Sequence, residues 1–358
     1  MRLRPPRSTW GRLALLLPAF AAMIGLLVWR GPDWNLVADA FRFVAWQWVV
    51  AALALNLVSV VARAAAWERV IEQAMPPPTP PFRTVFSAFA VGLFANAVLP
   101  GRIGELARVA VLTRRQKLKR RSDAWATLVG TVFAHRVFDL FPTLLLIGYV
   151  LSTAKIPHWA LTSLIVFAAV GFGLFAFALA SARGHHRSVL EEVGPVRRLV
   201  TMARHGLGVM RAPVPAVQAA LLQSAGWTCQ LLAVWAAMRA FDIHLPLPAA
   251  GLVLLLMTVA MLFPLWPGNI GLVQAAIALP LVSYGVAYPK GFAFGIGLQA
   301  IEMSVGVGVG LLFLAREGLS FAMLKRMPGA EQAEVAPENE AEAGPVGGPP
   351  RARARISR

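Results

Sequence analysis

The sequence has little cysteine and little charge. Cys229 is the only cysteine among 358 residues, so no intrachain disulfide can form and a secreted disulfide scaffold is excluded. Asp, Glu, Lys and Arg make up 14% of the residues and apolar residues 58%, whereas soluble domains carry about 25% charged residues. One soluble core of this length cannot bury that much apolar surface. The composition therefore excludes an ordinary soluble enzyme and a disordered protein.

Acidic residues are also scarce relative to basic ones. The chain has 17 Asp and Glu against 34 Lys and Arg, which gives a formal net charge of +17. Such an excess is compatible with nucleic-acid binding, but here the basic residues lie between long apolar runs. This pattern is typical of the positive-inside signature of a membrane protein with several spans. We therefore expect a membrane lipid, and no nucleic acid, as the partner of the basic residues.

Six apolar runs are long enough to cross a bilayer, for which a helix needs roughly 20 residues. The first begins after four arginines and is interpreted as an anchored span, because no small-residue cleavage site follows it. These runs predict an all-α integral membrane protein, and they cover residues 13–29, 46–66, 124–151, 158–181, 216–238 and 291–315.

Two further apolar stretches are interrupted near their middle by a Pro-Gly pair. Residues 85–99 and 106–112 flank Pro100-Gly101, and residues 249–263 and 272–286 flank Pro267-Gly268. Each half is too short to span a bilayer, and proline and glycine disfavour a continuous helix. We expect two re-entrant helical hairpins, each of which enters and leaves on one side of the membrane.

The distribution of Lys and Arg supports this topology. With two hairpins, 22 Lys and Arg fall on the cytoplasmic side and five on the external side, the asymmetry that the positive-inside rule describes. Both termini are then cytoplasmic, and we expect the protein in a bacterial cytoplasmic (inner) membrane. The cytoplasmic segments are 1–12, 63–83, 114–121, 183–211 and 316–326.

The two Pro-Gly stretches share the pattern Pro-Gly-x-Ile-Gly, and each lies between two full spans. The predicted hairpins open to opposite sides, which is the inverted-repeat plan of many transporters. We predict a transmembrane domain over residues 1–326, with repeats at about 46–151 and 216–315, and a disordered tail over 327–358. The alternative is that Pro-Gly pairs recur by chance in a chain with 26 prolines and 30 glycines.

The first Pro-Gly stretch carries charged residues that suit anion binding. A broken helix leaves backbone N–H groups without partners, and the helix dipole adds positive charge there. Arg102 and Arg108 each lie three residues from Glu105, so the three share a helical face. The alternative is a tight turn that an ordinary ion pair stabilises. The binding residues expected at the two breaks are Arg102, Gly104, Glu105 and Arg108 in the first and Gly268, Asn269, Gly271 and Gln274 in the second.

Ionisable residues also occur within the predicted full spans, where they are costly and seldom face lipid. His135, Arg136 and Asp139 have helical spacing, which suits either a self-neutralising Arg–Asp pair or a headgroup contact or proton relay. Glu302 lies in the last span with Gln299 three residues before it, and its partner is not evident from the sequence. No ligand set at metal spacing occurs, so we expect no metal or cofactor.

Leu99-Pro-Gly-Arg-Ile-Gly-Glu-Leu-Ala-Arg, Arg136-x-x-Asp139 and Trp266-Pro-Gly-Asn-Ile-Gly together resemble the lysylphosphatidylglycerol synthase transmembrane, or flippase-like, family over roughly residues 10–320. The resemblance implies lipid handling. In bifunctional members this module is joined to an aminoacyl-transferase domain, which we do not expect here. His135 and Gln274 stand where family members often have glutamate.

Three functions follow as hypotheses. The first is a lipid translocase that handles a phospholipid or other anionic headgroup in a cavity at mid-membrane. The second is a non-transporting subunit, alone or as a homo-oligomer, that presents a lipid to a partner enzyme. The third, an intramembrane enzyme, is disfavoured because the spans show no nucleophile beside a histidine, and we expect the chain not to be an enzyme.

Overall fold

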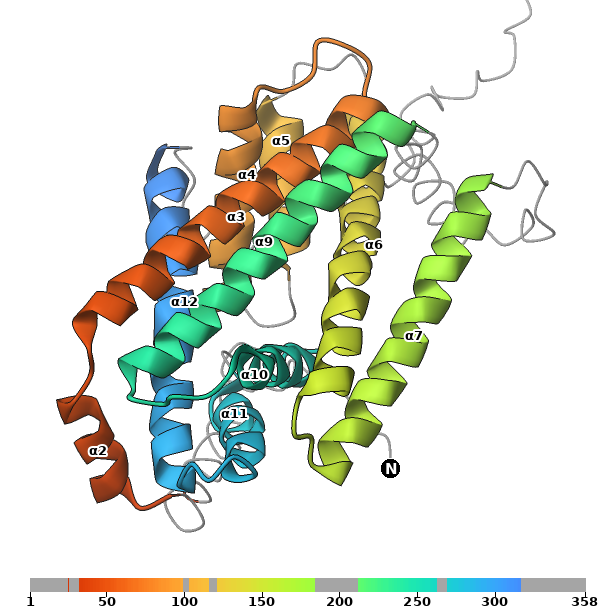
Figure 1. Ribbon diagram of the computed structural model, residues 1–358. Coiled ribbons are helices and arrows are strands. Elements are labelled where there is room, and N and C mark those ends of the chain that lie inside the picture. The colour runs from red at the N-terminus through yellow and green to blue at the C-terminus, as the bar shows by residue number, and fades with distance from the viewer. Residues whose placement is uncertain are drawn as a thin grey trace, which may run out of the picture.

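The computed structural model describes residues 25, 32–98, 103–115, 121–183, 212–262 and 269–316 (Figure 1). The secondary structure of this part consists of helices, without strands. They are α2 (Trp34–Arg42), α3 (Trp46–Ala74), α4 (Phe82–Val98), α5 (Gly104–Arg115), α6 (Arg121–Thr153), α7 (His158–Arg183), α9 (Pro213–Ala240), α10 (Leu247–Ala260), α11 (Leu272–Val282) and α12 (Tyr288–Arg316).

The long helices coincide with the predicted spans. Four described helices, α3, α6, α7 and α12, are long and apolar enough to cross a membrane. The fifth long helix, α9, has 28 residues and carries several polar side chains, including Gln223 and Gln230. The prediction of an all-α membrane protein is thus confirmed, while the first predicted span, 13–29, lies outside the described residues apart from Gly25.

Two pairs of short helices stand where the re-entrant hairpins are predicted. α4 and α5 have 17 and 12 residues, and α10 and α11 have 14 and 11. At 1.5 Å per residue the longest of these is about 26 Å, which is short of the ~30 Å hydrocarbon core. α4 packs against α5 and α10 packs against α11. Residues 99–102 and 263–268, which join the helices of each pair, lie outside the described part.

The two short-helix pairs lie toward opposite ends of the long helices. In Figure 1, α4 and α5 lie toward the end where α3 finishes and α6 starts. α10 and α11 lie toward the other end, where α3 starts and α6 finishes. The chain therefore enters each pair from a different end of the bundle.

Helix packing is matched between the two halves of the chain. α3 from one half runs beside α9 from the other (Figure 1). α4 packs against α12 and α10 against α6; α5 packs against α6 and α11 against α12; α3 packs against α6 and α9 against α12. In these contacts α3, α4, α5 and α6 correspond to α9, α10, α11 and α12 in that order. Each contact in one half therefore has an equivalent contact in the other half.

Small residues permit the closest approach between the two halves. A Cβ added at Gly310 of α12 would lie 2.3 Å from the Phe94 Cβ of α4 and 2.8 Å from the Ala90 carbonyl oxygen. α4 and α12 are therefore in backbone contact, which fixes the first short-helix pair against a helix of the other half.

Apolar side chains cover the outside of the bundle. On α7, Ile165, Val166, Val170 and Phe172 are each more than half exposed. Exposure of so many large apolar side chains on one helix is unfavourable in water and favourable in lipid. The surface of the bundle is therefore consistent with an integral membrane protein.

Candidate functional site

Several of the predicted binding residues line one cavity. It has a volume of about 130 Å³ and lies between α3, α4, α5 and α6. Of the sequence-predicted residues, Gly104, Glu105, Arg108, His135 and Arg136 line it. The other lining residues are Arg63, Phe89, Gly92, Leu93 and Asn96. Arg102 and Gly268 lie outside the described residues.

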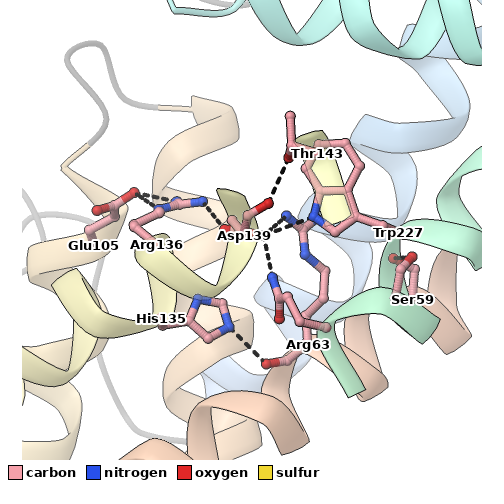
Figure 2. A network of polar contacts seen from close by, with 10 residues as sticks. Ser59, Arg63, Glu105, His135, Arg136, Asp139, Thr143 and Trp227 are labelled. Carbon is pink, nitrogen blue, oxygen red and sulfur yellow. Dashed lines mark hydrogen bonds and ion pairs between the residues drawn. The ribbon is translucent and has the colours of Figure 1, made fainter. Parts of the chain in front are cut away.

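Asp139 is the centre of a polar network beside this cavity (Figure 2). Its Oδ1 accepts hydrogen bonds from Arg63 Nη2 at 3.1 Å and Trp227 Nε1 at 2.9 Å, and also from Gln223 Nε2. Its Oδ2 accepts one from Arg136 Nη1 at 3.1 Å. The predicted Arg136–Asp139 pair is therefore present, and helices α3 and α9 contribute three further donors.

Glu105 connects the first short-helix pair to α6. Its Oε1 accepts from Arg136 Nε at 2.8 Å and from Arg136 Nη2. The sequence suggested pairing with Arg102 or Arg108, three residues away on either side, whereas the carboxylate pairs with Arg136 on the neighbouring helix. Arg136 consequently bridges Glu105 and Asp139, and a chain of four charges runs from α5 through α6 to Arg63 on α3 (Figure 2).

Arg108 is buried, with 4% of its surface exposed. Its guanidinium carbon lies 4.5 Å from the ring centroid of Trp67 and 5.5 Å from that of Phe89, which are cation–π contacts. Its Nε and Nη2 atoms are buried and donate no hydrogen bond to the residues that the structure describes. Two charged donors without acceptors are costly in this environment, and Arg108 forms no ion pair with a described residue of the cavity wall.

The cavity is surrounded by an excess of positive charge. Arg108 is within electrostatic range of two further arginines, Arg63 and Arg136, and of two carboxylates, Glu105 and Asp139. With all five ionised the cluster carries one net positive charge. A monoanion in the cavity would neutralise it.

His135 lies among these arginines and is also buried. Its Nε2 donates to the backbone carbonyl of Arg63 at 3.0 Å, since a carbonyl can only accept. Its Nδ1 is buried and has no hydrogen-bond partner in the described part of the chain. The imidazole packs edge to face on Phe89. The contact that the sequence suggested with Asp139 is replaced by one that ties α6 to α3.

Gly104 places the two arms of the first short-helix pair in backbone contact. A Cβ on Gly104 would lie 2.0 Å from the Gly92 carbonyl oxygen. The Gly104 N–H donates to Asn96 Oδ1 at 2.9 Å, so this amide at the start of α5 already has an acceptor. The expected anion recognition by free helix amides is thus reduced at Gly104, and the arginine side chains supply the donors.

The second pair is held by neutral side chains. The backbone is left-handed at Asn269 (φ 45°) and Gly271 (φ 91°), conformations that suit these two residue types. The Gly271 N–H donates to Gln274 Oε1 at 2.6 Å. Gln274 Nε2 donates to Gln299 of α12. Asn269, Gly271 and Gln274 therefore belong to a separate cluster and do not line the cavity.

Glu302 has its own partner. Gln230 Nε2 of α9 donates to Glu302 Oε1 at 2.7 Å. Glu302 forms no ion pair within the described part of the chain, although it is within electrostatic range of Arg63. The partner that the sequence left open is thus a neutral amide.

Arg63 is the main residue that the sequence analysis assigned elsewhere. It counts among the 22 cytoplasmic basic residues, because the apolar run ends at residue 66, yet α3 continues to Ala74 and places Arg63 inside the bundle. An arginine directly followed by Ala-Ala-Ala-Trp was the signal for this extension. Gln223 and Trp227 also contact Asp139, and Trp67 contacts Arg108. The seven-residue spacing of Gln223 and Gln230 indicated a role in helix association, and nothing in the spacing of the two tryptophans identified them.

The arrangement provides charge and hydrogen-bond donors. Among the described residues no group of three His, Cys, Asp or Glu is placed to hold a metal ion. The chemistry available at the cavity is recognition of an anion by arginine, which binds phosphate oxygens through its fork of N–H groups.

The chain matches the family described as the lysylphosphatidylglycerol synthase TM region over residues 11–310. The protein belongs to this family, and the resemblance stated from its motifs is confirmed. Its helices and its family together define an integral membrane protein with a function related to membrane lipids. No curated protein and no solved structure matches the chain.

Proposed function

We propose that the protein is a flippase-like lipid translocase that holds an anionic lipid headgroup in the cavity beside Arg108. The observation that carries the proposal is the buried Arg108 guanidinium with two unpartnered donor nitrogens. A phosphodiester supplies the acceptors that these nitrogens lack, and its single negative charge balances the net charge of the five-residue cluster.

The surroundings of the cavity favour a lipid over a free anion. Arg136 has 44% of its side chain exposed, so the polar network reaches the surface of the bundle between α5 and α6. Two large apolar residues near this ion pair are also exposed. Leu106 follows Glu105 on α5, and Phe133 lies one turn before Arg136 on α6. A headgroup at Arg136 would leave its acyl chains beside these apolar side chains, outside the bundle.

The fold supports an alternating mechanism. We propose six full spans and two re-entrant hairpins in an inverted repeat, with both termini cytoplasmic. The matched packing of α3–α6 and α9–α12 and the opposite placement of the two short-helix pairs support this arrangement. Movement of one hairpin relative to the other would then open the cavity to one leaflet at a time.

The test is translocation in proteoliposomes that contain fluorescent phosphatidylglycerol, read by dithionite quenching. We expect Arg108→Gln to lower the rate at least tenfold, because the headgroup loses its cationic partner. Arg42→Gln is the matched control, since Arg42 is an exposed arginine paired with Asp39 at the end of α2. Equal rates for wild type and Arg108→Gln, or equal rates for lipids with and without an anionic headgroup, contradict the proposal.

A second candidate function is a lipid-holding subunit that does not transport. The size of the cavity favours it, because about 130 Å³ accommodates a phosphate group but is smaller than the ~300–1,000 Å³ of typical ligand pockets. Anionic lipid that co-purifies in an Arg108-dependent manner, together with a stoichiometric partner protein and no translocation, would favour this function over the first.

A further inference from the structure

The two halves of the chain carry polar pairs at matched positions. Arg63 and Gln230 are each the eighteenth residue of their helices, α3 and α9. Asp139 and Glu302 are each the fifteenth residue from the ends of α6 and α12. Arg63 donates to Asp139 at 3.1 Å, and Gln230 donates to Glu302 at 2.7 Å. Glu302 is therefore the counterpart of Asp139 in the second half.

The match extends to the short-helix pairs. Arg136 and Gln299 are each the eighteenth residue from the ends of α6 and α12. Arg136 donates to Glu105 near the start of α5, and Gln299 accepts from Gln274 near the start of α11. The same connections are thus made twice, once with arginines and once with glutamines.

The two carboxylates differ in what stabilises their charge. Asp139 accepts from two arginines, a glutamine and a tryptophan. Glu302 accepts from the Gln230 amide. A carboxylate inside a membrane bundle with only a neutral donor loses much of the stabilisation of its charged form. Of the two, Glu302 is the acid that can take up a proton while the network around Asp139 stays intact.

Glu302 is electrostatically linked to the cavity through Arg63. Arg63 is within electrostatic range of Glu302 and also of Arg108 and Asp139 in the cavity cluster. A Cβ on Gly226 of α9 would lie 2.6 Å from the Arg63 Cγ, so the Arg63 side chain crosses at the contact between the two halves. Among the residues of the cavity cluster, Arg63 is the one within electrostatic range of Glu302.

Other ionisable groups on the elements that pack against α12 lie near helix ends. α11 has none, and the remaining ones are Arg83 on α4, Arg239 on α9, Asp39 and Arg42 on α2, and Glu68, Arg69 and Glu72 on α3. Cys229 adjoins Gln230 on α9. α12 itself has Tyr288, Lys290 and Arg316 at its two ends. Glu302 is therefore set apart from other acids of the described residues in this region.

The net charge of the cavity cluster depends on whether Glu302 is ionised. With Glu302 ionised, three arginines and three carboxylates cancel, and the cluster has no net charge to offer an anion. With Glu302 protonated, the cluster carries one positive charge that a monoanion neutralises. We propose that Glu302 takes up one proton from water when an anionic headgroup binds the cavity, so that headgroup binding and protonation are coupled. This inference rests on the anion site proposed above.

The test is isothermal titration calorimetry of the purified protein with dioctanoyl phosphatidylglycerol, in two buffers of different ionisation enthalpy, from pH 5 to 9. The buffer dependence of the heat counts protons taken up on binding, and Arg108→Gln protein corrects for partition of lipid into detergent. For wild type we expect uptake of about one proton per bound lipid over part of this range. In that part the affinity for the lipid should fall as the pH rises, by up to about tenfold per pH unit.

Two variants change Glu302 in opposite ways. Glu302→Gln keeps the site neutral, and Gln230→Arg keeps Glu302 ionised by giving it the partner that Asp139 has. Both leave the cluster with one net positive charge at every pH, so both should bind without proton uptake and with nearly pH-independent affinity. Glu72→Gln is the matched control, because Glu72 pairs with Arg69 near the end of α3, and it should behave as wild type.

The possible outcomes distinguish failure of the proposed proton coupling from failure of the proposed anion site. The coupling is overturned if wild type binds the lipid in an Arg108-dependent manner without proton uptake, or if proton uptake persists in either variant. Both results leave the anion site in place. Failure of wild type to bind the lipid more than Arg108→Gln does overturns the anion site, and the coupling with it. Should one variant fail to fold, the other variant and the wild-type proton count still decide.

Discussion

At the scale of single residues, Asp139 and Arg108 represent two ways to place a charge inside a membrane bundle. Asp139 is surrounded by donors from three helices, so its charge is compensated by the protein itself. Arg108 is stabilised by the faces of Trp67 and Phe89 but keeps two donor nitrogens without acceptors. The first arrangement holds the helices together, and the second leaves a charge for a ligand.

Replacing Asp139 tests the structural part of this contrast. We expect Asp139→Asn to lower the free energy of unfolding by about 3 kcal/mol, because Arg63 and Arg136 lose their shared counter-charge while they remain in the bundle. The measurement is unfolding of the detergent-solubilised protein by titration with sodium dodecyl sulfate. Asp39→Asn, at an exposed position on α2, is the control and should change stability little. Equal stability of the two variants would show that the Asp139 network does not hold α3, α6 and α9 together.

At the scale of elements, the first short-helix pair depends on how closely its arms approach. The Gly104 position allows α5 to contact the backbone of α4 at Gly92, and the Asn96 side chain accepts the first amide of α5. Glu105 then ties the start of α5 to Arg136 on α6. The position of the cavity wall follows from these three contacts, since Gly104, Glu105 and Arg108 lie within about one turn and a half of α5.

Substitution of Gly104 tests this element directly. Alanine normally stabilises a helix relative to glycine by about 1 kcal/mol, but at Gly104 its Cβ would fall 2.0 Å from a backbone oxygen. We expect Gly104→Ala to cost about 1–3 kcal/mol of stability and to weaken anionic lipid binding through displacement of α5. Gly173→Ala on α7, where an added Cβ meets nothing within 4 Å, is the matched control and should be neutral or stabilising. A Gly104→Ala protein with wild-type stability and lipid binding would refute the close approach.

At the scale of the whole molecule, hydropathy and charge predict where the helices lie in the sequence better than they predict the contacts between helices. The long helices appear where the apolar runs place them, because a span must satisfy its backbone internally and present apolar side chains to lipid. The breaks near residues 100 and 267 follow from Pro-Gly in short apolar stretches. These features depend on local sequence.

The contacts between helices depend on features that local sequence does not contain. Glu105 has basic residues three positions away on both sides, yet pairs with Arg136, because α5 packs against α6. Arg63 lies at the end of an apolar run and resembles a cytoplasmic flank, but α3 extends about three further turns beyond it. The pairing of Gln230 with Glu302 likewise needs the position of α9 beside α12.

The polar pairs of the two halves match in position but differ in charge, and this difference makes the molecule asymmetric. Equivalent helices make equivalent connections, but Arg63 on α3 and Arg136 on α6 have the glutamines Gln230 on α9 and Gln299 on α12 as their counterparts. We therefore propose that headgroup binding belongs to one half of the molecule. The other half supplies Gln230, Gln274 and Gln299 as neutral partners and Glu302 as the acid that responds to binding.

The most direct measurement of the central claim is the lipid complement of the protein itself. Wild type, Arg108→Gln and Arg42→Gln would be extracted from the same membranes in mild detergent, and their bound lipids would be quantified by mass spectrometry. We predict that wild type and Arg42→Gln retain an anionic phospholipid at about one per chain, enriched over the bulk membrane, and that Arg108→Gln loses this enrichment. The same anionic lipid enrichment in all three proteins would contradict the claim that the buried arginine of the cavity holds the headgroup.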